Sequence, residues 1–168
     1  MPTRITIADS HRDWPLRFAD LAERIRTTLG ARALRLEHVG STSVPGLAAK
    51  PIIDILLVVA DAADEAEYRP PLEGAGFTFT LREPDWHEHR LFKRTDPAMH
   101  LHVFSAGCVE IDRMLAFRDR LRVDAHDCEL YEATKRRLAQ REWQSAYARA
   151  KTDVVREILQ RALRSARA

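Results

Sequence analysis

A carboxylate interrupts the most apolar segment of this sequence. Asp54 lies inside the run IIDILLVV, where a buried charge is costly unless it has a partner. The surrounding segment from Pro51 to Val59 predicts a strand that is buried on both faces. Asp54 is therefore either a catalytic carboxylate that holds a divalent cation or a carboxylate bonded to neighbouring backbone, and the cost of burial favours the cation.

The segment GSTSVPGLAAK before this strand predicts a phosphate-binding turn. Small side chains leave its backbone N–H groups unhindered, hydroxyls add further donors, and Lys50 follows close to Asp54. Its first residues, here called the GSTS turn, are Gly40, Ser41, Thr42 and Ser43. It is not a P-loop, because the spacing GxxxxGK(S/T) is absent and Leu47 stands where the lysine would be. The alternative is a loop that merely joins two strands, with Lys50 at the surface.

Two histidines alternate in the segment Met99–Phe104. The strand period of two places His100 and His102 on one face. If this strand lies beside the strand of Asp54, the three side chains can bind a divalent metal, and imidazole suits Zn²⁺, Mn²⁺ or Fe²⁺ better than Mg²⁺. The alternative is a pair of histidines hydrogen-bonded at the mouth of a cleft. His87 and His89 also alternate, but they lie in a segment with loop character, so no role is assigned to them.

Basic side chains near the second predicted hairpin strand can neutralise phosphate charge. Arg90 and Arg94 share one face of that strand, and Lys93 lies on the other face with Leu91. We expect Arg90 and Lys93 to contribute to phosphate binding. Most of the many basic residues from Lys135 onward predict, instead, the solvated face of a helix.

The elements that must position these residues alternate along the chain. Apolar periodicity predicts a helix from Trp14 to Leu29 with Asp13 as its N-cap, and strands follow at residues 33–39, 51–59 and 77–81. A helical stretch from residue 61 is expected to break at Pro70. Segments 90–93 and 99–104 predict a hairpin, and the remainder to about residue 163 is expected to be helical, with Trp143 and Tyr147 on an apolar face. This pattern predicts an α/β fold.

Composition limits the class of protein. The 168 residues include 27 basic and 25 acidic side chains, so the net charge of +2 gives no reason to expect nucleic acid or an anionic membrane as a partner. With 45% apolar residues, no apolar run long enough to span a membrane and no signal-like start, the chain predicts a single domain across residues 1–168 in the cytoplasm. Cys108 and Cys128 lack the spacing of a zinc or redox motif.

The longest of these motifs resembles a known family. The run EHVGSTSVPGLAAKPIIDI closely resembles the signature of the GrpB family, and the resemblance continues through RLFKR, HLHVF, FRDRLR, YEATKRRLA and the late pair Tyr147 and Lys151. The family is similar to the nucleotidyltransferase superfamily. That similarity implies a mixed sheet flanked by helices, with a helical C-terminal part, and adds Lys151 to the expected phosphate-binding residues.

The resemblance also assigns roles to positions. In the superfamily a Gly-Ser turn holds nucleotide phosphates, and an Asp-x-Asp/Glu pair on the next strand binds two metal ions. Gly40 and Ser41 match the turn and Asp54 matches the first carboxylate, but Leu56 occupies the place of the second. The third carboxylate falls on the HLHVF strand, where a histidine stands instead. A two-metal mechanism needs bridging anionic ligands, so the resemblance implies nucleotide binding with an incomplete carboxylate set.

Three functions remain open at this level. The first is a nucleotidyltransferase that binds nucleoside triphosphate at the GSTS turn and Lys50, with Mg²⁺, Mn²⁺ or Zn²⁺ on Asp54 and a histidine as ligand or base. The second is a non-catalytic domain that binds a nucleotide or CoA-type molecule or assists dephospho-CoA kinase, because the family also occurs fused to that enzyme. The third is a structural domain that stabilises a partner and binds neither a nucleotide nor a CoA-type molecule.

Overall fold

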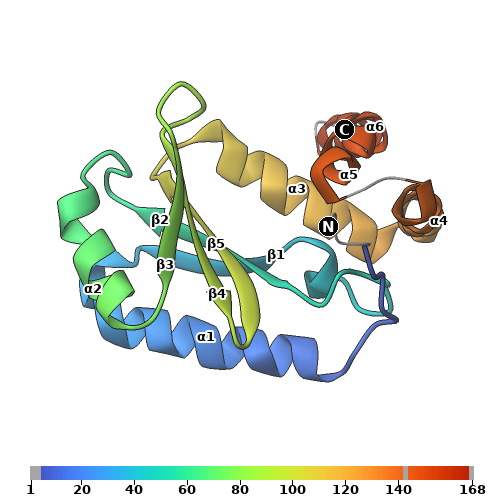
Figure 1. The fold of residues 1–168 in the computed structure, drawn as a ribbon. Coiled ribbons are helices and arrows are strands. Elements are labelled where there is room, and N and C mark those ends of the chain that lie inside the picture. Colours follow the sequence, from blue (N-terminus) through green and yellow to red (C-terminus); the bar gives the residue numbers. More distant parts are fainter. Residues whose placement is uncertain (1–4, 142–143, 167–168) are drawn as a thin grey trace.

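The computed structural model of the protein describes residues 5–141 and 144–166 (Figure 1). Trp143 therefore lies outside the described residues. The elements, in chain order, are α1 (Asp13–Leu29), β1 (Arg35–Val39), β2 (Ile53–Val59), α2 (Arg69–Gly74), β3 (Thr78–Glu83), β4 (His89–Thr95), β5 (Ala98–Ser105), α3 (Val109–Val123), α4 (Ala125–Arg141), α5 (Gln144–Ala150) and α6 (Thr152–Ser165). Short 3₁₀ turns lie at Gly30–Arg32, Ser41–Ser43 and Glu65–Glu67.

The strands form one mixed sheet in the order β1-β2-β5-β4-β3. The central strands β2 and β5 run parallel, and the remaining neighbours pair antiparallel. The hairpin of β4 and β5 turns at Thr95 and Ala98, as the sequence predicts. The fold is thus the mixed sheet with flanking helices that the sequence indicates.

Helices cover both faces of the sheet (Figure 1). On one face, α1 and α2 pack against alternate residues of β2 such as Ile55 and Leu57. On the other face, α3 packs against Leu56 and Val58. Strand β2 is therefore buried on both faces, which explains its almost unbroken apolar sequence. No helix in the described part of the chain is long and apolar enough to cross a membrane.

Two local predictions are wrong. Pro70 and Pro71 do not break a helix but lie in the first turn of α2, where a missing N–H costs little. The cap of α1 also lies one residue earlier than expected, because Arg12 takes the N-cap position and Asp13 lies inside the first turn. The described residues of the C-terminal part are helical as predicted and form the helices α3 to α6.

Candidate functional site

Pairing of the strands brings the residues with reactive or ligating side chains together. Asp54 on β2 lies opposite Val39 on β1 and opposite His100 on β5. Because the GSTS turn directly follows Val39, it emerges beside Asp54. The alternation of β5 then places His102 on the same face as His100, so the neighbouring strands carry all three side chains on the face that α3 covers.

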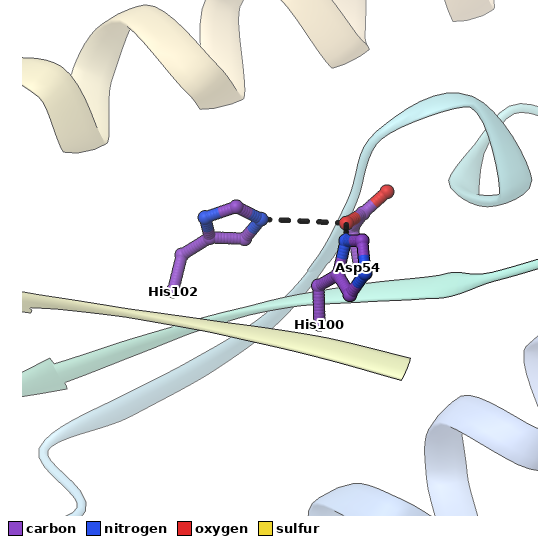
Figure 2. A group of neighbouring side chains, drawn as sticks. All are labelled: Asp54, His100 and His102. Carbon is purple, nitrogen blue, oxygen red and sulfur yellow. Dashed lines mark hydrogen bonds and ion pairs between the residues drawn. The ribbon is translucent and has the colours of Figure 1, made fainter. Parts of the chain in front are cut away.

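Asp54, His100 and His102 form a compact cluster (Figure 2). Oδ1 of Asp54 lies 3.5 Å from His100 Nδ1 and 3.3 Å from His102 Nε2. Burial acts to raise the pKa of Asp54, but hydrogen bonds from both histidines, and then their charge, outweigh it and hold that pKa well below its usual range. Asp54 is therefore ionised at neutral pH and can hold a cation.

Gly40 is required where the GSTS turn passes Asp54. Its φ of +70° lies in the region that favours glycine, and a Cβ built on it would stand 2.5 Å from Asp54 Oδ2. The glycine therefore lets the backbone approach a carboxylate of the protein itself. The sequence predicts that this backbone lies close to a ligand. In the structure, the group nearest to a Cβ on Gly40 is the Asp54 side chain.

The hydroxyls of the turn serve mainly to hold its shape. Thr42 Oγ1 donates to the Ile52 carbonyl at 3.3 Å, and Ser43 Oγ donates to the Gly40 carbonyl at 2.5 Å. His38 Nε2 lies 2.9 Å from Thr42 Oγ1, and donates to it because the hydroxyl hydrogen is already used. Ser41 and Thr42 line the adjoining cavity, whereas Ser43 does not.

His38 is itself held neutral beneath the turn. It is buried, and its ring stacks on Phe18 with centroids 4.8 Å apart. Burial, followed by the positive charge of Arg122, lowers the pKa of His38 to about 4. Arg122 in turn donates to the Ser43 carbonyl from Nε and Nη2, at 3.0 and 2.8 Å. Helix α3 thus fixes the far side of the turn.

A cavity of about 350 Å³ lies between the GSTS turn, the ends of β2 and β5, and the helices α4 and α5. Asp54, His100 and His102 line it on the sheet side. The basic residues Lys50, Lys135 and Lys151 line it together with Tyr147. The cavity thus combines a cluster of one carboxylate and two imidazoles with a group of lysines. A metal-bound phosphate would need both kinds of site.

Lys135 is the residue that the sequence interpretation most clearly missed. The sequence predicts a solvated helix face at this position, but Lys135 is 2% exposed and its Nζ donates to the Ala48 carbonyl at 2.5 Å. Burial, and then the charge of Lys151, lower the pKa of Lys135 to about 7. Its neighbours in the basic run YEATKRRLA gave no sign of this, because burial depends on how α4 packs against the segment after the turn.

Lys50, Lys151 and Tyr147 form a second basic group on the helix side. Both ammonium groups lie over the Tyr147 ring, at 4.5 Å for Lys50 and 5.1 Å for Lys151. Burial and the charge of Lys151 lower the pKa of Lys50. The hydroxyl of Tyr147 is buried without a hydrogen-bond partner among the described residues. The positive charges of Lys50 and Lys151 repel each other, so an anion bound between them would be favourable.

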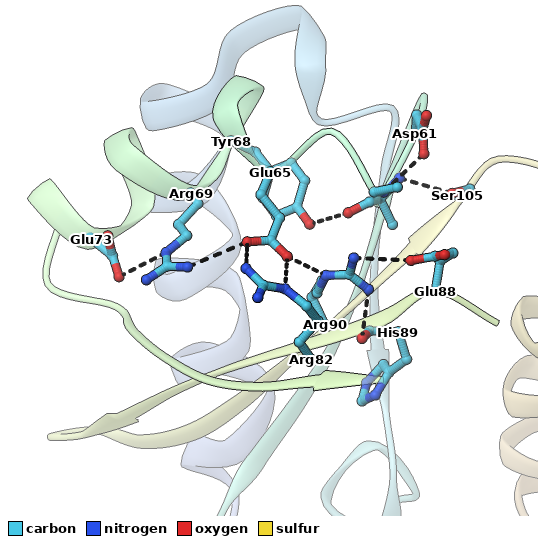
Figure 3. A network of polar contacts seen from close by, with 12 residues as sticks. Asp61, Glu65, Tyr68, Arg69, Glu73, Arg82, Glu88, His89, Arg90 and Ser105 are labelled. Carbon is cyan, nitrogen blue, oxygen red and sulfur yellow. Dashed lines mark hydrogen bonds and ion pairs between the residues drawn. The ribbon is translucent and has the colours of Figure 1, made fainter. Parts of the chain in front are cut away.

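Arg90 does not join this site. It lies opposite Val103 of β5, on the face that α1 and α2 cover, and is 4% exposed. Figure 3 shows it bonded to Glu65 and Glu88, in a network in which Glu65 also holds Arg69 and Arg82. Because side chains alternate along β4, Arg90 lies on the opposite face of the sheet from His102. The structure therefore places Arg90 in a structural ion-pair network and not at the expected phosphate site.

Lys93 lies on the same face of the sheet as His100 but outside the cavity. It is paired in register with His100, and it is exposed and lines a different hollow, with Thr80 and Asp96. The structure therefore brings together Gly40, Ser41, Thr42, Lys50, Asp54, His100, His102 and Lys151, and leaves Ser43, Arg90 and Lys93 outside the cavity.

The donor set fits one transition-metal ion better than a pair of magnesium ions. The ligand atoms of Asp54, His100 and His102 lie within 4.8 Å of one another, with one carboxylate and two imidazoles. Leu56, where a second carboxylate would stand, is fully buried under α3. The other candidate group in the described residues centres on Asp127, whose oxygens are already held by Arg120 and Arg161.

Comparisons with known proteins agree with this architecture. The model of the GrpB family, described as GrpB protein, matches residues 4–161. A UPF0157 protein of Halalkalibacterium halodurans is 57% identical over 160 residues, which are 94% of this chain and 82% of that protein. A dephospho-CoA kinase of Mycolicibacterium paratuberculosis is 32% identical over 167 residues, but the match spans only 40% of that protein.

Solved structures show the same fold. The crystal structure of the conserved protein GrpB from Enterococcus faecalis matches with a TM-score of 0.86 and 28% identity, over 97% of this chain and 100% of that one. The Cid1 poly(U) polymerase, in a structure described as bound to Mg and 3′-dATP, matches with a TM-score of 0.57 and 14% identity, over 81% and 44% of the two chains. The second likeness concerns the fold alone, and it confirms the nucleotidyltransferase-like sheet.

Proposed function

The chain belongs to the GrpB family, and from that premise we propose that it binds a phosphate-bearing ligand, most simply a nucleotide, in the cavity beside the GSTS turn. One observation carries this proposal: a single cavity is lined by Lys50, Lys135 and Lys151 and by the Asp54, His100, His102 cluster. A charged lysine desolvated among others is stabilised by an anion, and an isolated carboxylate beside imidazoles is stabilised by a cation. A metal-bound phosphate supplies both.

Each group has a part in this binding mode. Ser41 and the backbone of the turn contact phosphate oxygens, and the lysines neutralise their charge. Asp54, His100 and His102 hold one divalent metal, which would polarise the phosphate when bound. Two-metal phosphoryl transfer is not part of the proposal, because Leu56 replaces the second carboxylate and Asp54 is the single carboxylate of the cluster among the described residues. That the protein is a single domain, and that it is located in the cytoplasm, stay predictions.

A second candidate is a non-catalytic domain that serves dephospho-CoA kinase. It is favoured by the match to a protein of that name, of which this chain spans 40%. Under this proposal the cavity takes the phosphates of a CoA-type molecule, and binding does not depend on a metal at Asp54.

Thermal-shift measurements separate the two. Nucleoside triphosphates, pyrophosphate, CoA and dephospho-CoA are tested with Mg²⁺, Mn²⁺, Zn²⁺ or chelator. A ligand present at 100 times its Kd stabilises the folded state by about 2.7 kcal/mol, which is a shift of several degrees. The first proposal predicts a metal-dependent shift that Asp54→Asn abolishes. The second predicts a shift with CoA compounds that survives both chelation and Asp54→Asn.

The chain offers a matched control for the lysines. Lys135→Met should remove most of the shift, whereas Lys93→Met makes the same change of charge on the same face of the sheet, outside the cavity, and should leave the shift intact. If no ligand shifts the melting temperature of the wild type, with or without metal, both proposals are wrong.

A further inference from the structure

We infer that Glu83 and His89 are positioning residues that set the tautomer of His102, so that the Asp54, His100, His102 cluster presents an imidazole lone pair to one ion of the zinc class. This inference rests on the metal part of the proposed function. It extends the site to two residues outside the cavity, one of which lies in a segment that the sequence left without a role.

A chain of hydrogen bonds leads from the surface to the cluster across β3, β4 and β5. Glu83 Oε2 lies 2.7 Å from His89 Nδ1, and His89 Nε2 lies 3.1 Å from His102 Nδ1. On the other side of its ring, His102 Nε2 lies 3.3 Å from Asp54 Oδ1. The pairing of Glu83 with His89 in the sheet register keeps the first link in place.

The direction of each hydrogen bond follows from the chemistry of the groups. An ionised Glu83 only accepts, so Nδ1 of His89 carries a hydrogen. In a neutral imidazole the other nitrogen then accepts, so His89 Nε2 receives a hydrogen bond from Nδ1–H of His102. Nδ1–H of His102 is thus committed to His89. The hydrogen by which His102 Nε2 bonds to Asp54 in the metal-free protein is therefore the one that leaves when a metal ion binds. A metal ion on Asp54 meets that nitrogen as a ligand.

The surroundings of His89 hold it in this orientation. Its ring is buried, stacks on Phe104 with centroids 4.8 Å apart, and meets the edge of Trp86 at 5.2 Å. Burial between aromatic rings disfavours an additional charge on His89 and excludes the water that could replace its hydrogen bonds. A histidine that binds a metal usually donates its other N–H to a fixed acceptor. His102 would bind the metal through Nε2 and donate Nδ1–H to His89.

Zinc binding tests this inference without any nucleotide. The affinity for Zn²⁺ alone is measured by competition with a chromophoric chelator. Loss of such an outer partner lowers metal affinity about 10- to 100-fold, so His89→Phe should lose affinity by that factor. His89→Gln should restore most of it, because its amide can donate to Glu83 and accept from His102. The matched change His126→Phe, at an exposed histidine outside the chain of bonds, should leave the affinity unchanged.

The tautomer itself is visible in the metal-free wild type. Long-range ¹H–¹⁵N correlation spectra of the imidazoles should show a hydrogen on Nδ1 of both His89 and His102. A His102 protonated on Nε2 alone would overturn the inference, as would an unchanged zinc affinity in a folded His89→Phe variant or a wild type that binds no zinc. Because neither readout involves a phosphate ligand, failure of nucleotide binding would leave this result standing.

Discussion

Gly40 lies so close to Asp54 that a methyl group on Gly40 would stand 2.5 Å from Asp54 Oδ2. We predict that Gly40→Ala moves the carboxylate out of place and lowers zinc affinity as well as stability. Gly46→Ala is the matched control, because Gly46 also has a positive φ, of +80°, but has nothing within 4 Å of its Cβ position. Both changes should also cost on the order of 1 to 3 kcal/mol of unfolding free energy for the backbone conformation alone.

The clash should appear as the difference between the two variants. Urea unfolding should show that Gly40→Ala is less stable than Gly46→Ala by at least about 1 kcal/mol, the lower end of the cost of overpacking. Equal losses, together with unchanged zinc affinity, would mean that Asp54 does not need the space beside the turn.

Acid should destabilise the protein through His38. Burial and Arg122 lower the pKa of His38 from its ordinary value of 6.5 to about 4, so the unfolded chain binds this proton more readily than the folded one. Stability from this residue is present above about pH 6.5 and is lost as the pH falls toward 4. Linkage gives a loss of about 2 kcal/mol between pH 7 and pH 5.

The variant His38→Gln isolates that contribution. It removes the titrating ring, and its amide can still donate to Thr42, so the loss of unfolding free energy between pH 7 and pH 5 should be smaller than in the wild type by about 2 kcal/mol. Urea titrations at the two pH values measure it. The same loss in both proteins would show that His38 is protonated in the folded state.

Ligand affinity should fall as the pH rises through the pKa of Lys135. Burial and Lys151 lower that pKa to about 7, and the charged form is the one that attracts phosphate. A ligand that binds only the charged form should bind about fivefold more weakly at pH 8 than at pH 7, and should take up a proton. Calorimetry in buffers of different ionisation enthalpy measures both quantities.

Lys151→Met provides the control for this titration. Removing the neighbouring charge should weaken binding but raise the pKa of Lys135, so the fall in affinity should begin at higher pH than in the wild type. A midpoint that stays near pH 7 in the variant would assign the titration to the ligand or to another group.

The outline of the site was predictable because it depends on local sequence. A charge inside IIDILLVV and two alternating histidines can each be recognised from period and composition alone. Their meeting could not be, since it needs β5 to lie parallel to β2 with His100 opposite Asp54. Parallel pairing joins segments that are distant in sequence, and a single sequence does not specify the register.

The errors have the same physical origin. Lys135 looks like its solvated neighbours in YEATKRRLA, but packing of α4 over the Ala48 carbonyl buries it. Arg90 was expected to bind phosphate on charge alone, yet the face to which its strand assigns it holds Glu65. His89 belongs to a segment that looked like a loop, and only the hydrogen bond to His102 gives it a role. In each case a tertiary contact that the local sequence does not specify determines where the polar side chain lies and what it contacts.

A crystal structure with zinc and the nucleotide that stabilises the protein most would test the central claim most directly. Data collected at the zinc absorption edge should show one anomalous peak about 2.1 Å from Asp54, His100 and His102, with phosphate density between that peak and the lysines of the cavity. An anomalous peak elsewhere, or a nucleotide bound away from Lys50, Lys135 and Lys151, would contradict the account.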